Sequence, residues 1–441
     1  MSNRIAPILL ILALLALGFV SLAAAQEAAP AQNGAAAQDE AALRARVMRL
    51  LQKVPLIDGH NDTPGQFRRR VAGHVDQLNF RDTTTLTPPM HTDLTRLRAG
   101  GVGGQFWSVF IPISRFGGEP GDVQRVIEQM DLVRRLVAAY PDDLELAFTA
   151  DDIVRIHRQG KIASLMGMEG GHSIENSLAA LRALYHLGAR YMSITHAKNL
   201  AWADSATDEP LHGGLTPFGK EVIREMNRLG MLVDLAHVSP DTMHDALDVA
   251  EAPVIFSHSS AKTICGHARN VPDDVLTRVK DNRGVVMVCF LISYVSEELR
   301  LHAEARQQML AQLRQEHPDP SQGDAMAAAI RDWDAANPAP VATLSQVADH
   351  IDHIRAVAGI DCIGIGSDYD GMPPGPAGLE DVSTYPALFV ELLRRGYSDE
   401  DIAKIAGLNV LRVMREVEQT AARLQTERKP SDALITELDR R

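Results

Sequence analysis

Six short, mainly apolar runs in this sequence each lead into a histidine or an acidic residue. Each run has the length of a β-strand, and the residue types that follow can bind a metal ion or transfer a proton. These residues are, in chain order, the His60 and Asp62 pair, Glu169, His196, His237, His258 and Asp368. In a parallel β/α barrel the carboxyl ends of the strands meet on one face, so residues distant in sequence gather around one point. The pattern therefore indicates an enzyme.

Strand candidates alternating with helical stretches predict the fold. Eight strand candidates lie at residues 54–58, 105–111, 162–168, 191–195, 231–235, 254–257, 285–290 and 362–366. Helical patterns between them lie at residues 122–139, 177–187, 217–229, 240–249 and 344–358. Continuously apolar strands alternating with helices are typical of a parallel sheet that is covered on both faces. We predict a (β/α)8 TIM-type barrel over residues 46–425, with a metal site at the C-terminal strand ends and a helical insertion at 296–342 over the barrel mouth.

Composition narrows the class of ligand. The chain has 441 residues and 45% hydrophobic content, which one elaborated barrel would almost fill. Its formal net charge is -13. Because there is no basic excess to neutralise a phosphate backbone, nucleic-acid binding is excluded from the expected functions. A small molecule or peptide fits better as the substrate.

The two ends of the chain are interpreted separately from the barrel. Arg4, the apolar stretch 5–20 and the small residues 23–25 form the pattern of a secretory signal peptide over residues 1–25. This pattern predicts a periplasmic or secreted protein. An uncleaved signal anchor stays open as an alternative, because the stretch approaches membrane-spanning length. Residues 26–45 are predicted to be a flexible linker, and residues 426–441 a charged tail.

Some residues with metal-binding potential are not assigned to a site. Cys265, Cys289 and Cys362 are odd in number and lack metal-type spacing, so buried free thiols are favoured. A disulfide between Cys265 and Cys289 stays open. His350 and His353 have helical spacing, and we interpret them as part of a solvated helix face.

Five of the strand-end side chains fit a pair of zinc ions. They are His60, Asp62, Glu169, His237 and His258. Taken singly, each has an ordinary explanation as a turn residue, a helix-entry carboxylate or a buried core histidine. Converging carboxylates, however, need a compensating positive charge when they are buried. Two Zn²⁺ ions would supply it, with one histidine and one carboxylate on the first, two histidines on the second, and a bridging carboxylate.

Seven sequence blocks together resemble the membrane (renal) dipeptidase family of zinc peptidases. They occur in the family's order and cover about residues 50–415. The blocks are Asp58-Gly59-His60-Asn61-Asp62, the run from Met168 to Ile174, Thr195-His196 with Trp202-Ala203-Asp204, Asp234 to Ser239, Phe256 to Ala261, Arg269 to Asp273, and Gly364 to Gly371.

The resemblance implies a role for each candidate residue. His60 and Asp62 would bind one zinc ion, His237 and His258 the other, and Glu169 would bridge them. The three remaining residues would act on the substrate. His196 would contact it near the scissile carbonyl, Arg269 would hold the free carboxylate of a dipeptide, and Asp368 would be the acid/base. Small dipeptides are thus the implied partners, with a homodimer left open.

The sequence also departs from the family's pattern. Lys198 stands where vertebrate members carry a disulfide cysteine, so that bridge is expected to be absent. Leu291 follows Phe290 where many members have an aromatic residue, so a contact that this residue makes on the oxyanion side or in the pocket of those members is not expected to be kept. Residues 426–441 lack the apolar tail of a lipid-anchored form. The chain therefore resembles an unanchored bacterial relative, with no stable membrane anchor expected after signal cleavage.

Two other functions stay open at this level. A binuclear amidohydrolase acting on N-acyl amino acids would keep the metals but would not require a free substrate amine. A non-hydrolytic metal-binding homologue would keep the ligands but lack a working Asp368.

Overall fold

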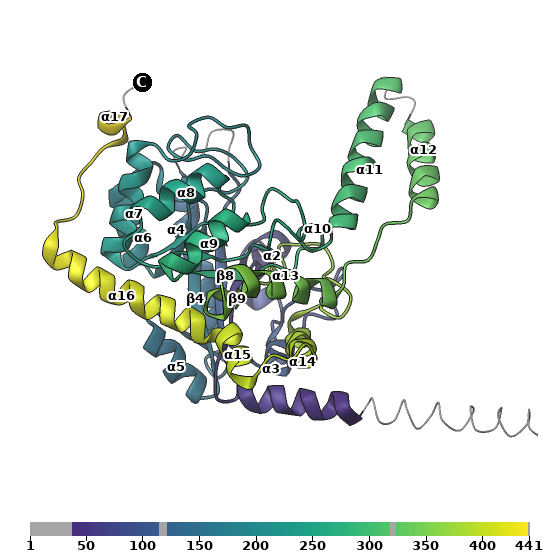
Figure 1. Cartoon of the computed structure of the whole chain (residues 1–441), viewed down its shortest axis with the longest axis horizontal. Helices are drawn as coiled ribbons and strands as arrows, with labels where there is room; N and C mark the ends of the chain where they lie inside the picture. Colours follow the sequence, from purple (N-terminus) through teal and green to yellow (C-terminus); the bar gives the residue numbers. More distant parts are fainter. Residues whose placement is uncertain (1–37, 114–120, 318–322, 440–441) are drawn as a thin grey trace, which may run out of the picture. The chain divides into compact units, whose positions relative to one another are not determined.

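The computed structural model describes residues 38–113, 121–317 and 323–439 (Figure 1). The chain divides into two units, residues 1–49 and residues 50–441. In the first unit the described residues, 38–49, are helical, so the end of the segment predicted as a flexible linker forms a helix. Its alanine, glutamate and arginine side chains are strong helix formers, which explains the difference. The predicted signal peptide lies outside the described residues.

Eight parallel strands of the second unit form a closed barrel. They are β1 (Leu56–Asn61), β2 (Val102–Phe110), β4 (Ile162–Glu169), β5 (Ala189–Ser193), β6 (Leu232–Asp234), β7 (Ile255–Phe256), β8 (Val285–Val288) and β9 (Ile363–Ile365). The strands follow one another in the order β2-β1-β9-β8-β7-β6-β5-β4, and pairing of β2 with β4 closes the ring. The predicted (β/α)8 barrel is therefore confirmed.

The strand boundaries differ from prediction where the sequence signal is weak. A further strand, β3 (Leu144–Leu146), pairs with the first residues of β4 and was not predicted, because three residues carry no usable periodicity. β2 begins at Val102, three residues earlier than predicted. Gly103 allows this, because a Cβ there would lie 2.8 Å from the Cα of Pro55. The small residue lets β2 approach the segment that leads into β1.

The helices that follow the strands agree more closely with prediction. The longer ones are α2 (Thr63–Val71), α4 (Asp122–Ala139), α5 (Ala150–Arg158), α6 (Leu178–His186), α7 (Pro217–Leu229), α8 (Pro240–Val249), α9 (Asp273–Asn282), α13 (Leu344–Val357), α14 (Tyr385–Arg394) and α16 (Asn409–Glu427). Side-chain caps define several of these starts, since Ser177, Thr216 and Ser239 each accept a hydrogen bond from a backbone N–H of the first turn.

The insertion between β8 and β9 forms a helical hairpin. After the short α10 (Ile292–Val295) it consists of α11 (Glu297–Glu316) and α12 (Gly323–Ala336), which lie side by side and project from the barrel in Figure 1. An ion pair between Arg306 and Asp334, 2.8 Å long, joins the two helices. The hairpin was expected to cover the barrel mouth, but it projects from the barrel in Figure 1, and on α11 only Leu299 and Leu313 are buried.

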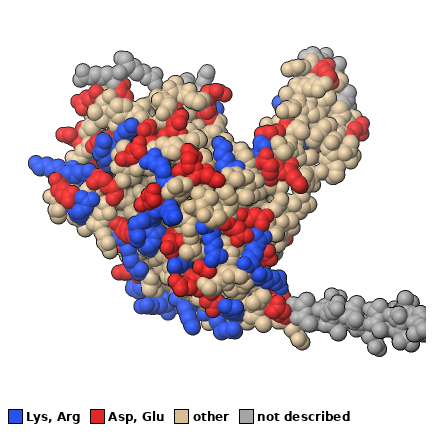
Figure 2. Space-filling view, viewed as in Figure 1, with Lys and Arg blue, Asp and Glu red and all other residues tan. Residues whose placement is uncertain are grey.

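The charged C-terminal segment packs against the barrel. The backbone N–H of Phe218, in the first turn of α7, donates to the Asp439 carboxylate over 3.0 Å. Arg182 donates to the carbonyl oxygen of Ser431 over 2.8 Å. Elsewhere acidic and basic side chains are interspersed over the face shown in Figure 2. None of the described helices has the length and apolarity needed to cross a membrane.

The cysteine prediction is confirmed, whereas the one for His350 is wrong. Cys265, Cys289 and Cys362 are buried free thiols. His350 is fully buried instead of solvated: its Nδ1 accepts from the backbone N–H of Ala261 over 3.0 Å and its Nε2 donates to a carbonyl oxygen. Burial lowers the pKa of His350 to about 4, and the ring serves as a structural link between loops.

Glycines make room for a methionine inside the barrel. Met287 of β8 is fully buried. A Cβ on Gly59 would lie 2.4 Å from its Sδ, and one on Gly364 would lie 2.8 Å from its Cγ. The thioether therefore fills space that two neighbouring strands leave empty.

Met287→Ala is expected to lower the free energy of unfolding by about 2–5 kcal/mol, because rigid strands cannot collapse into the cavity. Urea denaturation measures the loss. Met309→Ala on the projecting α11, where the side chain is only half-buried, should cost much less. Equal losses in the two variants would contradict this account of the barrel interior.

Candidate active site

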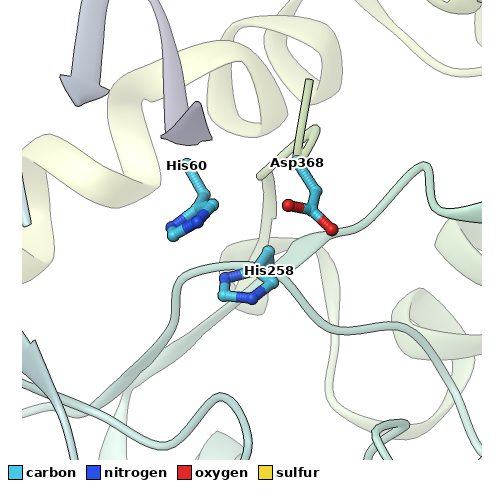
Figure 3. A group of neighbouring side chains, drawn as sticks. All are labelled: His60, His258 and Asp368. Atoms are coloured by element: carbon cyan, nitrogen blue, oxygen red, sulfur yellow. The ribbon is translucent and has the colours of Figure 1, made fainter. Parts of the chain in front are cut away.

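The predicted metal ligands come together at the C-terminal ends of the barrel strands. They are His60 in β1, Asp62 before α2, Glu169 at the end of β4, and His237 and His258 in the loops after β6 and β7. All five are buried. Asp368, after β9, joins them. Figure 3 shows the side chains of His60, His258 and Asp368 pointing toward a common space from three separate segments.

The carboxylate of Glu169 lies at the centre of the cluster. Its Oε1 is 3.0 Å from Nε2 of His237 and 3.6 Å from Nε2 of both His60 and His258. The Nε2 of His60 is 3.3 Å from the carboxylate of Asp62. Two groups suited to holding an ion share Glu169: one also contains His60 and Asp62, and the other His237 and His258.

Hydrogen bonds on the outer side of two imidazoles fix their orientation. The Nδ1 of His60 lies 2.8 Å from the hydroxyl of Tyr191, which donates its own proton to a backbone carbonyl. The Nδ1 of His258 lies 2.9 Å from Oγ of Ser257, which donates to Asp234 over 2.7 Å. Because each hydroxyl donates its own hydrogen to another oxygen, it accepts a hydrogen bond from the imidazole. Both Nδ1 atoms therefore carry the ring hydrogen. The Nε2 lone pairs are left to face the centre, as metal ligation requires.

The charges of the cluster fit a metal ion. Burial raises the pKa of Glu169 to about 7, although the charge of His60 opposes it. Burial would lower the pKa of His60, but Glu169 and Asp62 outweigh it and raise this pKa to about 10. The Nε2 of His60 is buried without a hydrogen-bond partner. A divalent cation would neutralise these carboxylates and displace the proton from Nε2 of His60, and imidazole nitrogens with carboxylate oxygens are ligands that zinc prefers.

Unusual backbone geometry aims two of these side chains. His237 has φ of 74° and Asp368 has φ of 68°, in the left-handed region that residues other than glycine seldom adopt. Such strain is common at functional sites. Gly371 is also required locally, because a Cβ there would lie 2.1 Å from Oδ2 of Asp62 and 2.9 Å from Oδ1 of Asp368.

A pocket of about 340 Å³ opens above the cluster. His196 and Phe110 line one part of it, with their rings 4.8 Å apart, and Leu291 and Tyr294 line another. Burial, assisted by the charge of Arg269, lowers the pKa of His196 to about 3, so its imidazole is neutral. The volume suits a small ligand.

Arg269 is a fully buried cation beside this pocket. Its Nη1 donates to Oγ of Ser259 over 3.2 Å and its Nη2 to the carbonyl oxygen of His258 over 3.1 Å, while Nε has no hydrogen-bond partner. The guanidinium lies 5.4 Å from the ring centre of Tyr294. In the described part of the chain it forms no ion pair with a carboxylate. A buried guanidinium without a carboxylate partner is suited to binding an anion.

Several residues of the site were not identified from sequence. Tyr191 and Asp234, which orient the histidines through hydroxyls, were placed only in strands. Phe110 and Tyr294 could have been identified from sequence, because both are aromatic residues at or near the ends of predicted strands. Arg69, which also lines the pocket, is one of three consecutive arginines, and nothing in the sequence distinguishes it from the other two.

Comparison with known proteins agrees with this geometry. Residues 44–428 match the family described as membrane dipeptidase, peptidase family M19. The chain is 43% identical over 372 residues to the dipeptidase tcpJ of Claviceps purpurea, covering 83% of this chain and 77% of that protein.

Solved structures agree with the fold. The probable dipeptidase PvdM from Pseudomonas aeruginosa has a TM-score of 0.72 at 25% identity, covering 86% of this chain and 99% of that one. A metallopeptidase from Rhodobacter sphaeroides, solved with a phosphinate mimic of L-Ala-D-Ala, has a TM-score of 0.67 at 22% identity, with 83% and 99% coverage. Since the family match spans the whole barrel and a metal-binding cluster lies at its centre, the chain belongs to the membrane dipeptidase family and is a metal-dependent dipeptidase.

Proposed function

We propose that the protein hydrolyses the peptide bond of dipeptides with two zinc ions. The observation that carries this proposal is the position of Glu169, which is shared by two groups of candidate ligands. His60 and Asp62 would hold one ion, His237 and His258 the other, and Glu169 would bridge them. Bound zinc supplies Lewis acidity, which lowers the pKa of water toward neutrality and polarises a carbonyl.

Asp368 is suited to move the protons of the reaction. Burial holds the pKa of its carboxyl well above the usual value, and bound cations would lower this pKa and favour the ionised form that can accept a proton. It lies beside His60 and His258, within reach of the centre. We infer that it accepts a proton from the attacking water and returns it to the nitrogen of the leaving amine. The neutral His196, on the opposite wall, would contact the substrate near the scissile carbonyl.

Arg269 accounts for selection of dipeptides. Its planar guanidinium matches a carboxylate in two parallel hydrogen bonds. Because it is held by Ser259 and by the backbone of a ligand residue, its distance from the cluster is fixed. A free carboxylate one residue beyond the scissile bond would reach it. A longer peptide would present an amide there and leave the guanidinium unpaired.

Metal analysis should return two zinc ions per chain, and Glu169→Gln should lose at least one of them together with activity. The reason is that the amide no longer offsets the charge of two cations. Elemental analysis of the purified variants measures this. Glu221→Gln, which removes a carboxylate paired with Arg224 on α7, is the control and should keep both ions. A single tightly held ion in fully active protein would exclude the bridging role.

Asp368→Asn should keep most of its zinc while kcat falls by roughly 10²- to 10⁴-fold, the range expected for a positioned proton-transfer group. Steady-state kinetics and metal content are measured on the same sample. If the variant instead loses zinc and regains the rate when zinc is added back, Asp368 is a ligand and not the acid/base.

Arg269→Lys should reduce kcat/KM for dipeptides on the order of 10²-fold, because the charge remains but the bidentate geometry is lost. Dipeptide amides should be slow with the unmodified protein and lose little more in the variant. N-acetylated dipeptides test the requirement for a free amine. Equal rates on a dipeptide and its amide would remove the carboxylate-binding role and favour an amidohydrolase that acts on N-acyl amino acids.

A further inference from the structure

A second arginine lies at the mouth of the pocket, on the side of Asp62. Helix α2 begins directly after Asp62, and Arg69 lies in its second turn. The side chain folds back along the helix, so that a Cβ on Gly65 would lie 3.0 Å from its Nη1. Its Nη2 donates to the carbonyl oxygen of Asp370 over 3.3 Å. The guanidinium thereby lines the pocket beside Gly371.

Arg69 differs from the arginines on either side of it, whose guanidinium groups are engaged with other side chains or with the backbone. Arg68 forms an ion pair with Glu128 at 3.1 Å. Arg70 donates to the side chain of Gln66 and to the carbonyl oxygen of Pro88. Arg69 forms no ion pair with a carboxylate of the described residues, and most of its donors remain available. Its residue as a whole is exposed, so a ligand entering the pocket can reach it.

Arg69 and Arg269 lie far apart around the barrel mouth. Arg69 follows β1, and Arg269 follows β7. In the closed ring, β9 and β8 separate these strands on one side, and β2, β4, β5 and β6 on the other. Arg69 lines the pocket with Gly371, which adjoins Asp62, whereas Arg269 contacts the backbone of His258, so the two cations adjoin different parts of the metal-ligand cluster. A dipeptide whose carboxylate is held by Arg269 and whose scissile bond lies over the cluster would extend its N-terminal residue toward Arg69.

We propose that Arg69 is a specificity residue that favours dipeptides with an acidic N-terminal side chain, aspartate or glutamate. This inference rests on the dipeptidase function proposed above. A carboxylate there would pair with a guanidinium that has free donors. Phe110 and Gly371, which also line the pocket, carry no charge, whereas Asp62 and Asp368 adjoin Gly371 and would repel an acidic side chain while no cation is bound. Metal ions bound at the cluster would offset these two charges, so the test uses the zinc-loaded protein.

The test compares substrates that differ by one charge at nearly constant shape. For L-Glu-L-Ala and L-Gln-L-Ala the zinc-loaded protein should show a ratio of kcat/KM of about five, the upper end of what one exposed ion pair provides. Arg69→Gln should bring this ratio close to one, and Arg69→Lys should retain part of it. Arg68→Gln, on the same helix, should keep the full ratio. Raising the salt concentration should lower the ratio, because partly exposed charges are screened.

Metal content and thermal unfolding of each variant show whether a change in kcat/KM comes from altered specificity or from loss of zinc or of the fold. If the unmodified protein cleaves both dipeptides equally well, or prefers L-Gln-L-Ala, the specificity role is excluded. If Arg69→Gln slows both substrates equally and also loses zinc, Arg69 supports Asp62 and does not select substrate. If the zinc-loaded protein cleaves neither of these dipeptides nor any of a neutral panel, the dipeptidase proposal fails as well. That result is distinct from a loss of acidic preference alone.

Discussion

The carboxylate of Glu169 imposes the main electrostatic constraint on this structure. One of its oxygens lies within 3.6 Å of the Nε2 atoms of His60, His196, His237 and His258, which come from different strand ends. A buried carboxylate in such a position is costly unless positive charge compensates it. Without a metal ion, protons have to provide that charge, which is why the pKa of Glu169 rises and that of His60 rises too. The site is therefore built to be completed by cations.

The barrel explains why the cluster could be predicted before the structure was known. Parallel strands place their carboxyl ends on one face, so a ligand-type residue after each apolar run is enough to predict convergence. His60, Glu169 and His258 follow this rule directly. Features without such a rule were missed or misplaced: β3 is too short to show a period, and the α11–α12 hairpin has the same polar sequence whether it covers the mouth or projects from it.

Contacts between side chains from different strands were also beyond prediction. The hydroxyl that orients His60 belongs to Tyr191 in β5, and the carboxylate that orients His258 through Ser257 belongs to Asp234 in β6. Nothing in the local sequence of either histidine reveals its partner, since the register between strands decides it. His350 illustrates the same limit: its burial depends on the backbone of a loop that is 89 residues away in sequence.

Arg69, which lines the pocket, and Arg269, which is buried beside it, contribute to the charge balance in different ways. Arg269 is buried and helps to keep Glu169 ionised, as its charge lowers the pKa of that carboxyl. Once metal ions neutralise the central carboxylates, this contribution of Arg269 is no longer needed, and we expect its unpaired Nε to take part in binding an incoming carboxylate. Metal binding and anion binding should therefore favour each other. Bound metal ions neutralise the carboxylates that Arg269 otherwise compensates, and a bound anion then compensates the charge of Arg269. Arg69 is exposed and loses little solvation, so we expect it to act on the substrate at the mouth of the pocket, with only a small effect on the charge of Asp62.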